Sequence, residues 1–445
     1  MLDLAERVLA LQQDFGAPGL AVALVDQGGT QIECAGVASL ETRAPVSGNT
    51  LFQVGSLSKL YTALLVMQCV ERGQVDLDTP MQQVLDDLRL GDPSAARAIS
   101  VRHLLSHTSG LDGDFALFDD SGIAAYVRRL AEVGQLFAPG QGWSYSNSGY
   151  VLLGHLVEVL CGKTWANAVR QDVFDVVGLR GSVADPAQGG SHPLAVGHVP
   201  GPTGALMISP VKRLGLSLAP AGAVVCQSIE DLARTAQVLL DMACGDNRHG
   251  LLQAQTLTRM TKTQRTLKPN PLGATGWGLG VTLHADGVFG HDGATIGQRT
   301  SFRIDPSRRR AIAILSNGAP ADRPGLHDAI LDQAFGGSGK VVQAIPALAP
   351  VATAELARYV GTYQTVGLQI TVRQERDTLL AELQPAGQNL PSSLRRLQPI
   401  SRDRFASFAE PVGTRLDDLT FDLDPATGRA TAVFSLMRSH PRSTS

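Results

Sequence analysis

The sequence predicts an α/β domain followed by a small antiparallel β domain. Strands are expected in residues 19–36 and again in residues 277–317, with a long helical stretch between them, so one sheet is built from both ends of the first domain. After residue 359 short runs alternate apolar and polar positions, a pattern typical of an antiparallel barrel or sheet. With 445 residues, 44% of them hydrophobic, the chain is long enough for two cores.

The α/β domain is expected to occupy residues 1–340. It opens with an amphipathic helix and continues into two strands around the turn Asp26–Gly29. Residues 56–72 are apolar on almost every side and are followed by Gly73, so they predict a core helix that ends there. Later strands are expected at Gly276–Leu283, residues 287–297, Ser301–Asp305 and Ala311–Asn317.

Residues 341–353, rich in alanine and proline, are expected to link the two domains. The second domain, residues 354–445, contains no recognisable catalytic motif. Its strands are expected at Leu368–Arg373, Thr378–Leu383 and Leu419–Leu423.

Charge and composition argue against several classes of partner. The net charge is -3 and both signs are interspersed, which disfavours nucleic acid. No apolar run approaches the length of a membrane span, and the N-terminal leucines are mixed with charges, unlike a signal peptide, so a cytoplasmic location is expected. No metal or cofactor is expected. The five widely spaced cysteines favour reduced thiols over disulfides or a zinc site: Cys34, Cys69, Cys161, Cys226 and Cys244.

Ser56 and Lys59 stand three residues apart where the core helix begins. Such residues are neighbours on a helix, about 5–6 Å apart at Cβ, and the lysine leans back toward the serine. Burial would lower the pKa of Lys59 from about 10.4 and make it a base. Free N–H groups at the helix start would stabilise an oxyanion. The pair predicts an activated serine, although a capping serine beside a solvated lysine has the same spacing.

A second segment places Tyr145 and Asn147 on a loop before the apolar helical run Val151–Leu160. A phenol and an amide two residues apart converge on one site from an extended loop. Tyr145 can pass a proton once a nearby ammonium such as Lys59 lowers its pKa from about 10. Trp143 is a candidate lining residue. The alternative is a turn with a packed tyrosine.

A third segment, residues 287–297, is a predicted strand rich in glycine. Gly293 would permit a ligand backbone to approach closely. His291 is a candidate to orient or protonate a substrate, and the N–H of Ala294 is a candidate oxyanion donor. A lone histidine is more often structural, so this segment indicates a functional site only in combination with the other two segments.

Together the three segments resemble the serine β-lactamase and penicillin-binding-protein family, in particular its branch of class C β-lactamases, D-aminopeptidases and esterases. Arg102–Leu111 and Gly290–Gly297 are typical of that branch, and the resemblance covers residues 10–335. It implies a β-lactamase-like antiparallel sheet flanked by helices, with a helical subdomain. The second domain resembles the lipocalin-like accessory domain of some members.

The resemblance implies a role for each motif residue: Ser56 as the acylated nucleophile, Lys59 as its base, Tyr145 as a second proton-transfer group and Asn147 as a ligand of the substrate amide. The N–H groups of Ser56 and Ala294 would form the oxyanion hole. His291 stands where lysine stands in the Lys-Thr-Gly form of the motif. A neutral imidazole attracts a carboxylate less than an ammonium does, so true β-lactamase activity is not expected.

Three functions remain open from the sequence. The first is a serine acyl-transfer enzyme that forms an acyl-Ser56 intermediate with an ester, amide or D-aminoacyl peptide, hence with a small-molecule or short-peptide substrate. The second is a stand-alone penicillin-binding-protein-type thioesterase that releases and cyclises nonribosomal peptides, with a peptidyl-carrier domain as partner. The third is a catalytically silent binding module.

Two other enzyme classes are disfavoured. His103 and His107 are four residues apart, but the segment lacks the glutamate of the zinc-protease motif. No Gly-x-Ser-x-Gly surrounds any serine, which argues against an α/β-hydrolase.

Overall fold

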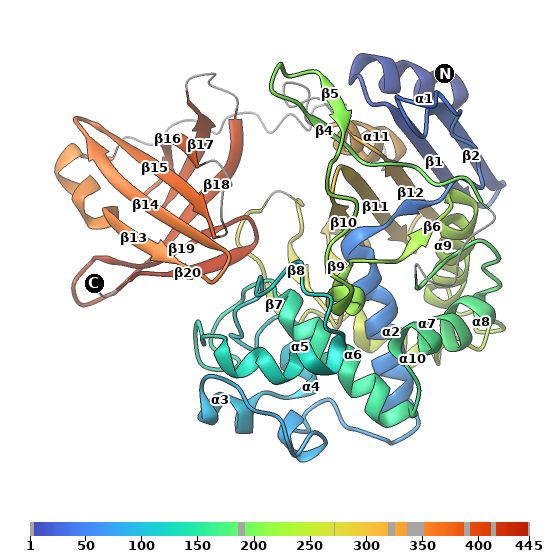
Figure 1. The fold of residues 1–445 in the computed structure, drawn as a ribbon, viewed down its shortest axis with the longest axis horizontal. Coiled ribbons are helices and arrows are strands. Elements are labelled where there is room, and N and C mark those ends of the chain that lie inside the picture. The colour runs from blue at the N-terminus through green and yellow to red at the C-terminus, as the bar shows by residue number, and fades with distance from the viewer. Residues whose placement is uncertain are drawn as a thin grey trace.

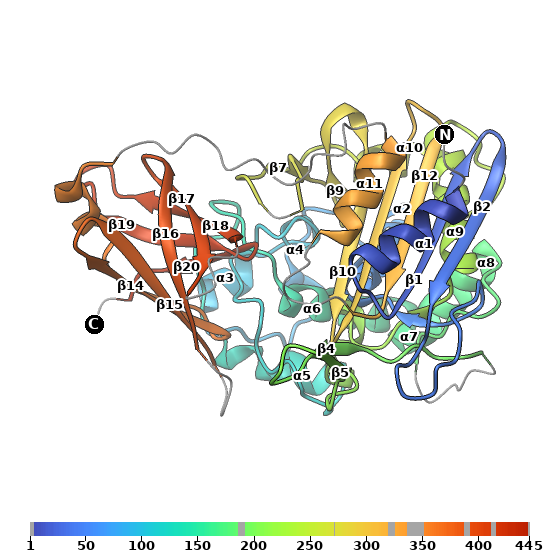
Figure 2. The same cartoon turned by 90° about the horizontal axis from the view of Figure 1, so that it is seen from above.

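The computed structural model describes residues 4–185, 192–270, 272–318, 325–335, 351–386, 392–410 and 415–443. It confirms an α/β domain with an antiparallel sheet flanked by helices, beside a second, barrel-like β domain (Figures 1 and 2). Most of the predicted linker, residues 341–350, lies outside the described residues. The domain bounds 1–340 and 354–445 therefore stay predictions.

The first domain is built on an eight-stranded sheet in the order β2-β1-β12-β11-β10-β9-β8-β7. As predicted, strands from both ends of the domain meet in it, because β1 pairs with β12. Its strands are β1 Gly19–Asp26, β2 Gly29–Gly36, β7 Arg265–Thr266, β8 Gly276–Trp277, β9 Thr282–Leu283, β10 Phe289–Thr295, β11 Gln298–Asp305 and β12 Arg310–Ser316.

Helices cover both faces of this sheet, so the central strands are buried on both sides. Alternate residues of β1 point to opposite faces. Leu20 and Val22 pack under α1 (Leu4–Asp14) and α11 (Leu326–Phe335), whereas Ala21 belongs to the core on the other face. That second core includes α2 (Ser58–Glu71) and α9 (Ile229–Ala243).

A helical subdomain lies below the sheet in Figure 1 and packs on α2. As predicted, a left-handed glycine, Gly73 with φ of 68°, follows the end of the core helix α2. The helix begins at Ser58, two residues later than predicted, because residues 55–57 form a 3₁₀ turn. The remaining helices are α3 Pro93–Ala98, α4 Val101–Leu105, α5 Ile123–Arg129, α6 Asn147–Cys161, α7 Trp165–Val169, α8 Asp175–Val177 and α10 Ala254–Met260. Short strands outside the large sheet are β3 Phe52–Gln53, β4 His198–Pro200, β5 Leu206–Ile208 and β6 Cys226–Gln227.

One predicted strand was wrong in detail. The run Gly276–Leu283 forms the hairpin β8–β9, in which Gly276 pairs with Leu283. The chain turns at Gly280, whose φ is 81°. This glycine packs against Ala63 of α2, and a Cβ atom on it would lie 2.2 Å from the Ala63 side chain. Close packing on α2 thus selects glycine and breaks the strand.

The second domain is an eight-stranded antiparallel meander in which each strand pairs with its neighbours in sequence. Tyr363 bridges to Arg442, so the first and last strands meet and nearly close a barrel. Its separate core includes Tyr359, Phe405 and Phe421. The strands are β13 Gly361–Gln364, β14 Leu368–Glu375, β15 Thr378–Pro385, β16 Ser393–Ser401, β17 Arg404–Ala409, β18 Arg415–Leu423, β19 Ala430–Ser435 and β20 Arg438–Pro441.

Two further observations concern the whole described chain. None of the helices in the described ranges combines the length and apolar character that crossing a bilayer requires. The five cysteines are free, although the sulfur atoms of Cys69 and Cys161 lie 3.7 Å apart between α2 and α6.

Candidate active site

Ser56 lies in a single 3₁₀ turn, η1 (Gly55–Leu57), which joins β3 to α2. The expected proximity is present, because Nζ of Lys59 is 3.3 Å from Oγ of Ser56. The turn is pressed against β10: a Cβ atom on Gly55, whose φ is 56°, would lie 2.8 Å from the backbone nitrogen of Ala294. The serine and the edge of the sheet are therefore direct neighbours.

Lys59 is fully buried. Its ammonium group donates to Oδ1 of Asn147 at 2.7 Å and to the carbonyl of Ala221. Burial, and then the charge of Arg438, lower the pKa of Lys59 well below its usual value, while Asp114 opposes the shift. Lys59 therefore gives up its proton more readily than a solvated lysine, as a base near Ser56 must.

Tyr145 lies beside this lysine, with Nζ of Lys59 4.7 Å from the ring centroid, and its side chain is only 8% exposed. Burial raises the pKa of Tyr145, and a hydrogen bond with Ser56 and the charge of Arg438 lower it only in part. The prediction of a lowered pKa was therefore wrong, because the free-energy cost of removing the phenolate from water exceeds the stabilisation that the nearby charges provide. Tyr145 is therefore a neutral phenol at pH 7, and its hydroxyl can donate a hydrogen bond.

Asn147 is the first residue of α6 rather than part of the preceding loop, and Ser146 caps this helix by accepting from the N–H of Gly149 at 3.0 Å. The amide of Asn147 connects two charged groups. Its Oδ1 accepts from Lys59, and its Nδ2 donates to Oδ1 of Asp114 at 2.9 Å.

His291 lies on β10 just before Gly293 and Ala294, which contact the turn that carries Ser56. The strand β9 pairs only with the two residues before His291, Phe289 and Gly290. Its Nδ1 donates to the carbonyl of Asp292 at 2.6 Å, and its Nε2 is buried without a partner among the described residues. Burial, and then the charge of Lys59, lower the pKa of His291 to about 4. The ring is neutral at pH 7, so Nε2 accepts a hydrogen bond and does not protonate a substrate.

The buried neutral ring of His291 predicts a pH-dependent stability. Its folded pKa of about 4 lies below the unfolded value of 6.5, so the unfolded chain binds more protons between these values. The stabilisation is complete above pH 6.5 and is lost as the pH falls toward 4. When the pH is lowered from 7 to 4.5, the free energy of unfolding, measured with urea, should fall by about 2–3 kcal/mol less in His291→Gln than in the wild type.

Burial also lowers the pKa of other histidines, among them His107, His284, His327 and His440, and these add to the acid sensitivity of the wild type and of His291→Gln alike. Their contribution cancels in the difference between the two proteins. Equal losses in the wild type and in His291→Gln would contradict the assignment of a neutral ring.

The remaining predicted site residues have different surroundings. A Cβ atom on Gly293 would lie 1.9 Å from the carbonyl oxygen of Val54, so this glycine permits the close approach of the chain's own backbone. Its predicted contact with a ligand stays a prediction. Ala294 is exposed at the same strand edge. Trp143 is 8% exposed and belongs to a buried cluster, here called the aromatic cluster, that contains Trp143, Tyr145, Trp277, Phe434 and Met437.

Sequence reasoning missed Asp114 and Arg438. Asp114 lies in the loop after α4 and holds Asn147, while Arg438 of the second domain forms a bidentate ion pair with Asp114. The side chains are 22% exposed for Arg438 and 21% for Asp114. The nearby Asp112 also contacts the second domain, accepting from the N–H of Val366 at 2.6 Å. The second domain, in which no catalytic motif was predicted, thus places one charged side chain beside the candidate site.

The two histidines considered for zinc have structural partners. His103 forms a capping box with Ser100 at the start of α4. His107 is buried and accepts from the N–H of Ser146 at 3.1 Å, which helps to place the start of α6. Within the described ranges, no group of three or more metal-ligating side chains forms a metal site.

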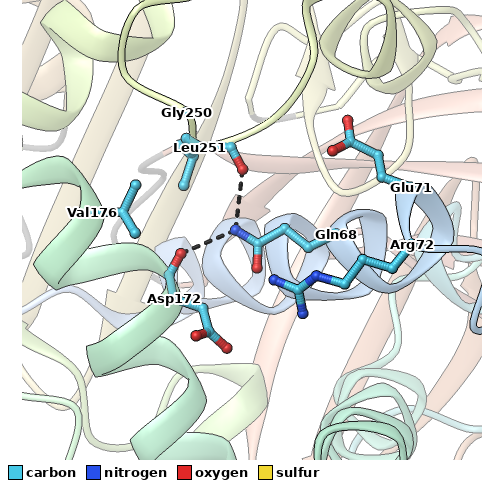
Figure 3. Close-up of a pocket in the computed structure, with 7 residues that line it drawn as sticks. All are labelled: Gln68, Glu71, Arg72, Asp172, Val176, Gly250 and Leu251. Atoms are coloured by element: carbon cyan, nitrogen blue, oxygen red, sulfur yellow. Dashed lines mark hydrogen bonds between the residues drawn. The ribbon is translucent and has the colours of Figure 1, made fainter.

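A cavity of about 240 Å³ borders the opposite end of α2 (Figure 3). Gln68 spans it and donates to the carbonyls of Asp172 and Leu251. The other lining residues are Glu71, Arg72, Val176 and Gly250. None of the residues around Ser56 lines this cavity, so it is separate from the candidate active site.

Comparisons with known proteins identify relatives in sequence and in fold. The Beta-lactamase family model matches residues 4–335. Penicillin-binding protein 4 of Amycolatopsis lactamdurans is 35% identical over 328 residues, which cover 71% of this chain and 85% of the relative.

Two similar solved structures match different shares of this chain. The crystal structure of SurE covers 98% of this chain and 97% of its own, with a TM-score of 0.79 and 29% identity, and SurE was also solved with D-Leu. The D-amino acid amidase from Ochrobactrum anthropi SV3, in complex with L-phenylalanine amide, covers 75% of this chain and 98% of its own, with a TM-score of 0.62 and 24% identity. The likeness to SurE thus extends over both domains.

Proposed function

Because the chain belongs to the β-lactamase family and is a serine hydrolase of that family, we propose that it transfers acyl groups through an ester formed on Ser56. The observation that carries this proposal is the contact between Oγ of Ser56 and the buried amine of Lys59. A lysine in this environment can act as a base for the serine hydroxyl beside it.

Acylation would begin when Oγ of Ser56 bonds to the substrate carbonyl carbon and its proton passes to Nζ of Lys59. The N–H groups of Ser56 and Ala294 would hold the resulting oxyanion, and each such donor contributes about 3–4 kcal/mol in comparable hydrolases. Collapse of the intermediate expels an amine, alcohol or thiol, which takes the proton of Tyr145, and Tyr145 regains a proton from Lys59.

Deacylation reverses these transfers with a new nucleophile. Water or an amine bonds to the acyl carbon, its proton passes to the Lys59–Tyr145 pair, and Oγ of Ser56 leaves with a proton. Nε2 of His291 is a buried acceptor without a partner in the described chain. It suits the N–H of an incoming amine or of a substrate amide, but not a substrate carboxylate.

The substrate is proposed to be an ester, an amide or a D-aminoacyl peptide. A second candidate function is release and cyclisation of a nonribosomal peptide from a thioester, with a peptidyl-carrier domain as partner. The D-Leu complex of SurE, a structure that resembles this chain over both domains, supports a D-amino acid as part of the substrate in this candidate. The carrier domain and a cytoplasmic location stay predictions.

Three substrates separate these functions. A peptidyl thioester that ends in a D-residue and has a free N-terminal amine should give a free acid if water is the acceptor, and a product lighter than that acid by the mass of one water molecule if it cyclises. The same thioester with an acetylated amine is the matched control, because it can only be hydrolysed. A D-aminoacyl anilide tests the amidase alternative. Binding of all three without turnover would indicate a silent binding module and would overturn the proposal.

A further inference from the structure

The hairpin β19–β20 of the second domain inserts its tip beside Tyr145. The tip consists of Leu436 and Met437. The carbonyl of Met437 accepts from the N–H of Tyr145 at 2.9 Å, and the N–H of Ser439 donates to Oγ of Ser144 at 3.2 Å. Met437 also packs in the aromatic cluster. The second domain therefore contacts the segment that carries a catalytic candidate.

The backbone of this tip is strained. Leu436 and Met437 have φ values of 49° and 67°, a left-handed conformation that favours glycine or asparagine. Asp417 holds the turn by accepting from the N–H of Leu436 at 3.1 Å and from Oγ of Ser435 at 2.7 Å. Strain of this kind persists only where surrounding contacts impose it, and the residue that follows the turn is Arg438.

Arg438 starts a chain of hydrogen bonds that ends at Lys59. Its Nη2 donates to Oδ1 of Asp114 at 2.8 Å, and its Nε donates to Oδ2. Asp114 accepts from Asn147, whose Oδ1 accepts from Lys59. The guanidinium carbon of Arg438 also lies 5.0 Å from the ring centroid of Tyr145.

The opposite charges of Arg438 and Asp114 shift the pKa of Lys59 in opposite directions. Burial would raise the pKa of Asp114, but Arg438 and Asn147 hold it below its usual value, so the carboxylate is charged. Arg438 lowers the pKa of Lys59 and Asp114 raises it. The other titratable groups that face Lys59 are Tyr145 just before α6, Tyr150 within α6, His107 after α4 and His291 on β10. The hydroxyl of Ser56 faces Lys59 from the turn before α2.

We propose that Arg438 and Asp114 are positioning residues, and that their interdomain ion pair holds Asn147 against Lys59, so that the second domain controls the base of the active site. This inference rests on the proposed role of Lys59 in acylation. A bidentate arginine pair suits the task, because its two parallel bonds fix the carboxylate in orientation as well as in place.

The test is the pH dependence of the rate at which a fluorophosphonate labels Ser56 in the full chain. The acid limb is the low-pH side of this profile, where the rate rises as Lys59 loses its proton. Arg438→Met removes a positive charge and leaves Asp114 uncompensated, which raises the pKa of Lys59, so the acid limb should move to higher pH by about one unit. Asp114→Asn should move it to lower pH, while the amide oxygen of the new side chain can still accept from Asn147. The double variant should return toward the wild-type limb.

Two control variants distinguish a positioning role from a clamp, that is, an ion pair that only holds the two domains together. Arg442→Met removes an arginine that bonds the carbonyls of Ala430 and Val360, away from Ser56, and should leave the limb in place. Arg438→Lys keeps the charge but loses the bidentate bond, so it should keep the limb and label more slowly. A clamp would lower the labelling rate of both single variants without opposite shifts.

The outcomes are distinct. Coincident acid limbs in the wild type, Arg438→Met and Asp114→Asn would overturn this inference while leaving the acyl-enzyme proposal intact. Failure of the wild type to label at Ser56 would instead overturn the proposed function. If Arg438→Met does not fold, as judged by circular dichroism, the direction of the shift in Asp114→Asn decides the question.

Discussion

Replacing Ser56 by alanine is expected to lower kcat/KM by about 10⁴–10⁶-fold, because no other group can form the acyl ester. Ser56 is the hydroxyl that Lys59 contacts, and it lies at the start of α2, where backbone N–H groups favour an oxyanion. The measurement is intact mass and peptide mapping after exposure to a fluorophosphonate, in which the serine oxygen displaces fluoride from phosphorus. One adduct on Ser56 is expected in the wild type and none in Ser56→Ala.

The neighbouring serine provides the matched control. Ser58 is the buried first residue of α2, two residues after Ser56, and its Oγ donates to the carbonyl of Gly55 at 2.8 Å, so it is a structural hydroxyl. Ser58→Ala should keep the adduct on Ser56. Persistent labelling of the Ser56→Ala protein at another serine, with full turnover, would show that the nucleophile lies elsewhere.

Replacing Lys59 by methionine is expected to lower kcat/KM by about 10²–10⁴-fold, the usual contribution of a positioned general base. Methionine fills the buried space without a charge or a lone pair that accepts the serine proton. In the wild type the activity should rise with pH as Lys59 loses its proton, because only the neutral amine is a base. The residual activity of Lys59→Met should lack this limb, which pH profiles of kcat/KM will show.

Lys163 offers a surface control for this substitution. It pairs with Asp172 at 2.7 Å, and its side chain is 25% exposed. Lys163→Met should leave both the rate and the pH limb unchanged. A Lys59→Met protein that keeps the wild-type acid limb would assign that limb to another group.

Local patterns in the sequence predicted the nucleophile and most of the framework. Ser56 and Lys59 lie within one helical turn, where three-residue spacing alone brings side chains together. The strand pair around residues 26–29 followed from alternation and turn chemistry, which are also local. The apolar run after Ser56 predicted burial of Lys59, and with it the direction of its pKa shift.

Prediction failed where a property depended on the surroundings of a residue. The pKa of Tyr145 is raised because burial outweighs the nearby charges, a balance that sequence spacing does not reveal. Gly293 is required by the backbone of Val54, which lies more than two hundred residues earlier in the chain.

The sequence by itself determined the family-like motifs and the contact between Ser56 and Lys59, because these two residues lie within one helical turn of each other. Only the tertiary structure decided that Asp114 and Arg438, 324 residues apart, complete the surroundings of that lysine. Their contact depends on how one domain packs on the other, and the electrostatic effect of each charge depends on burial and distance rather than on position in the chain.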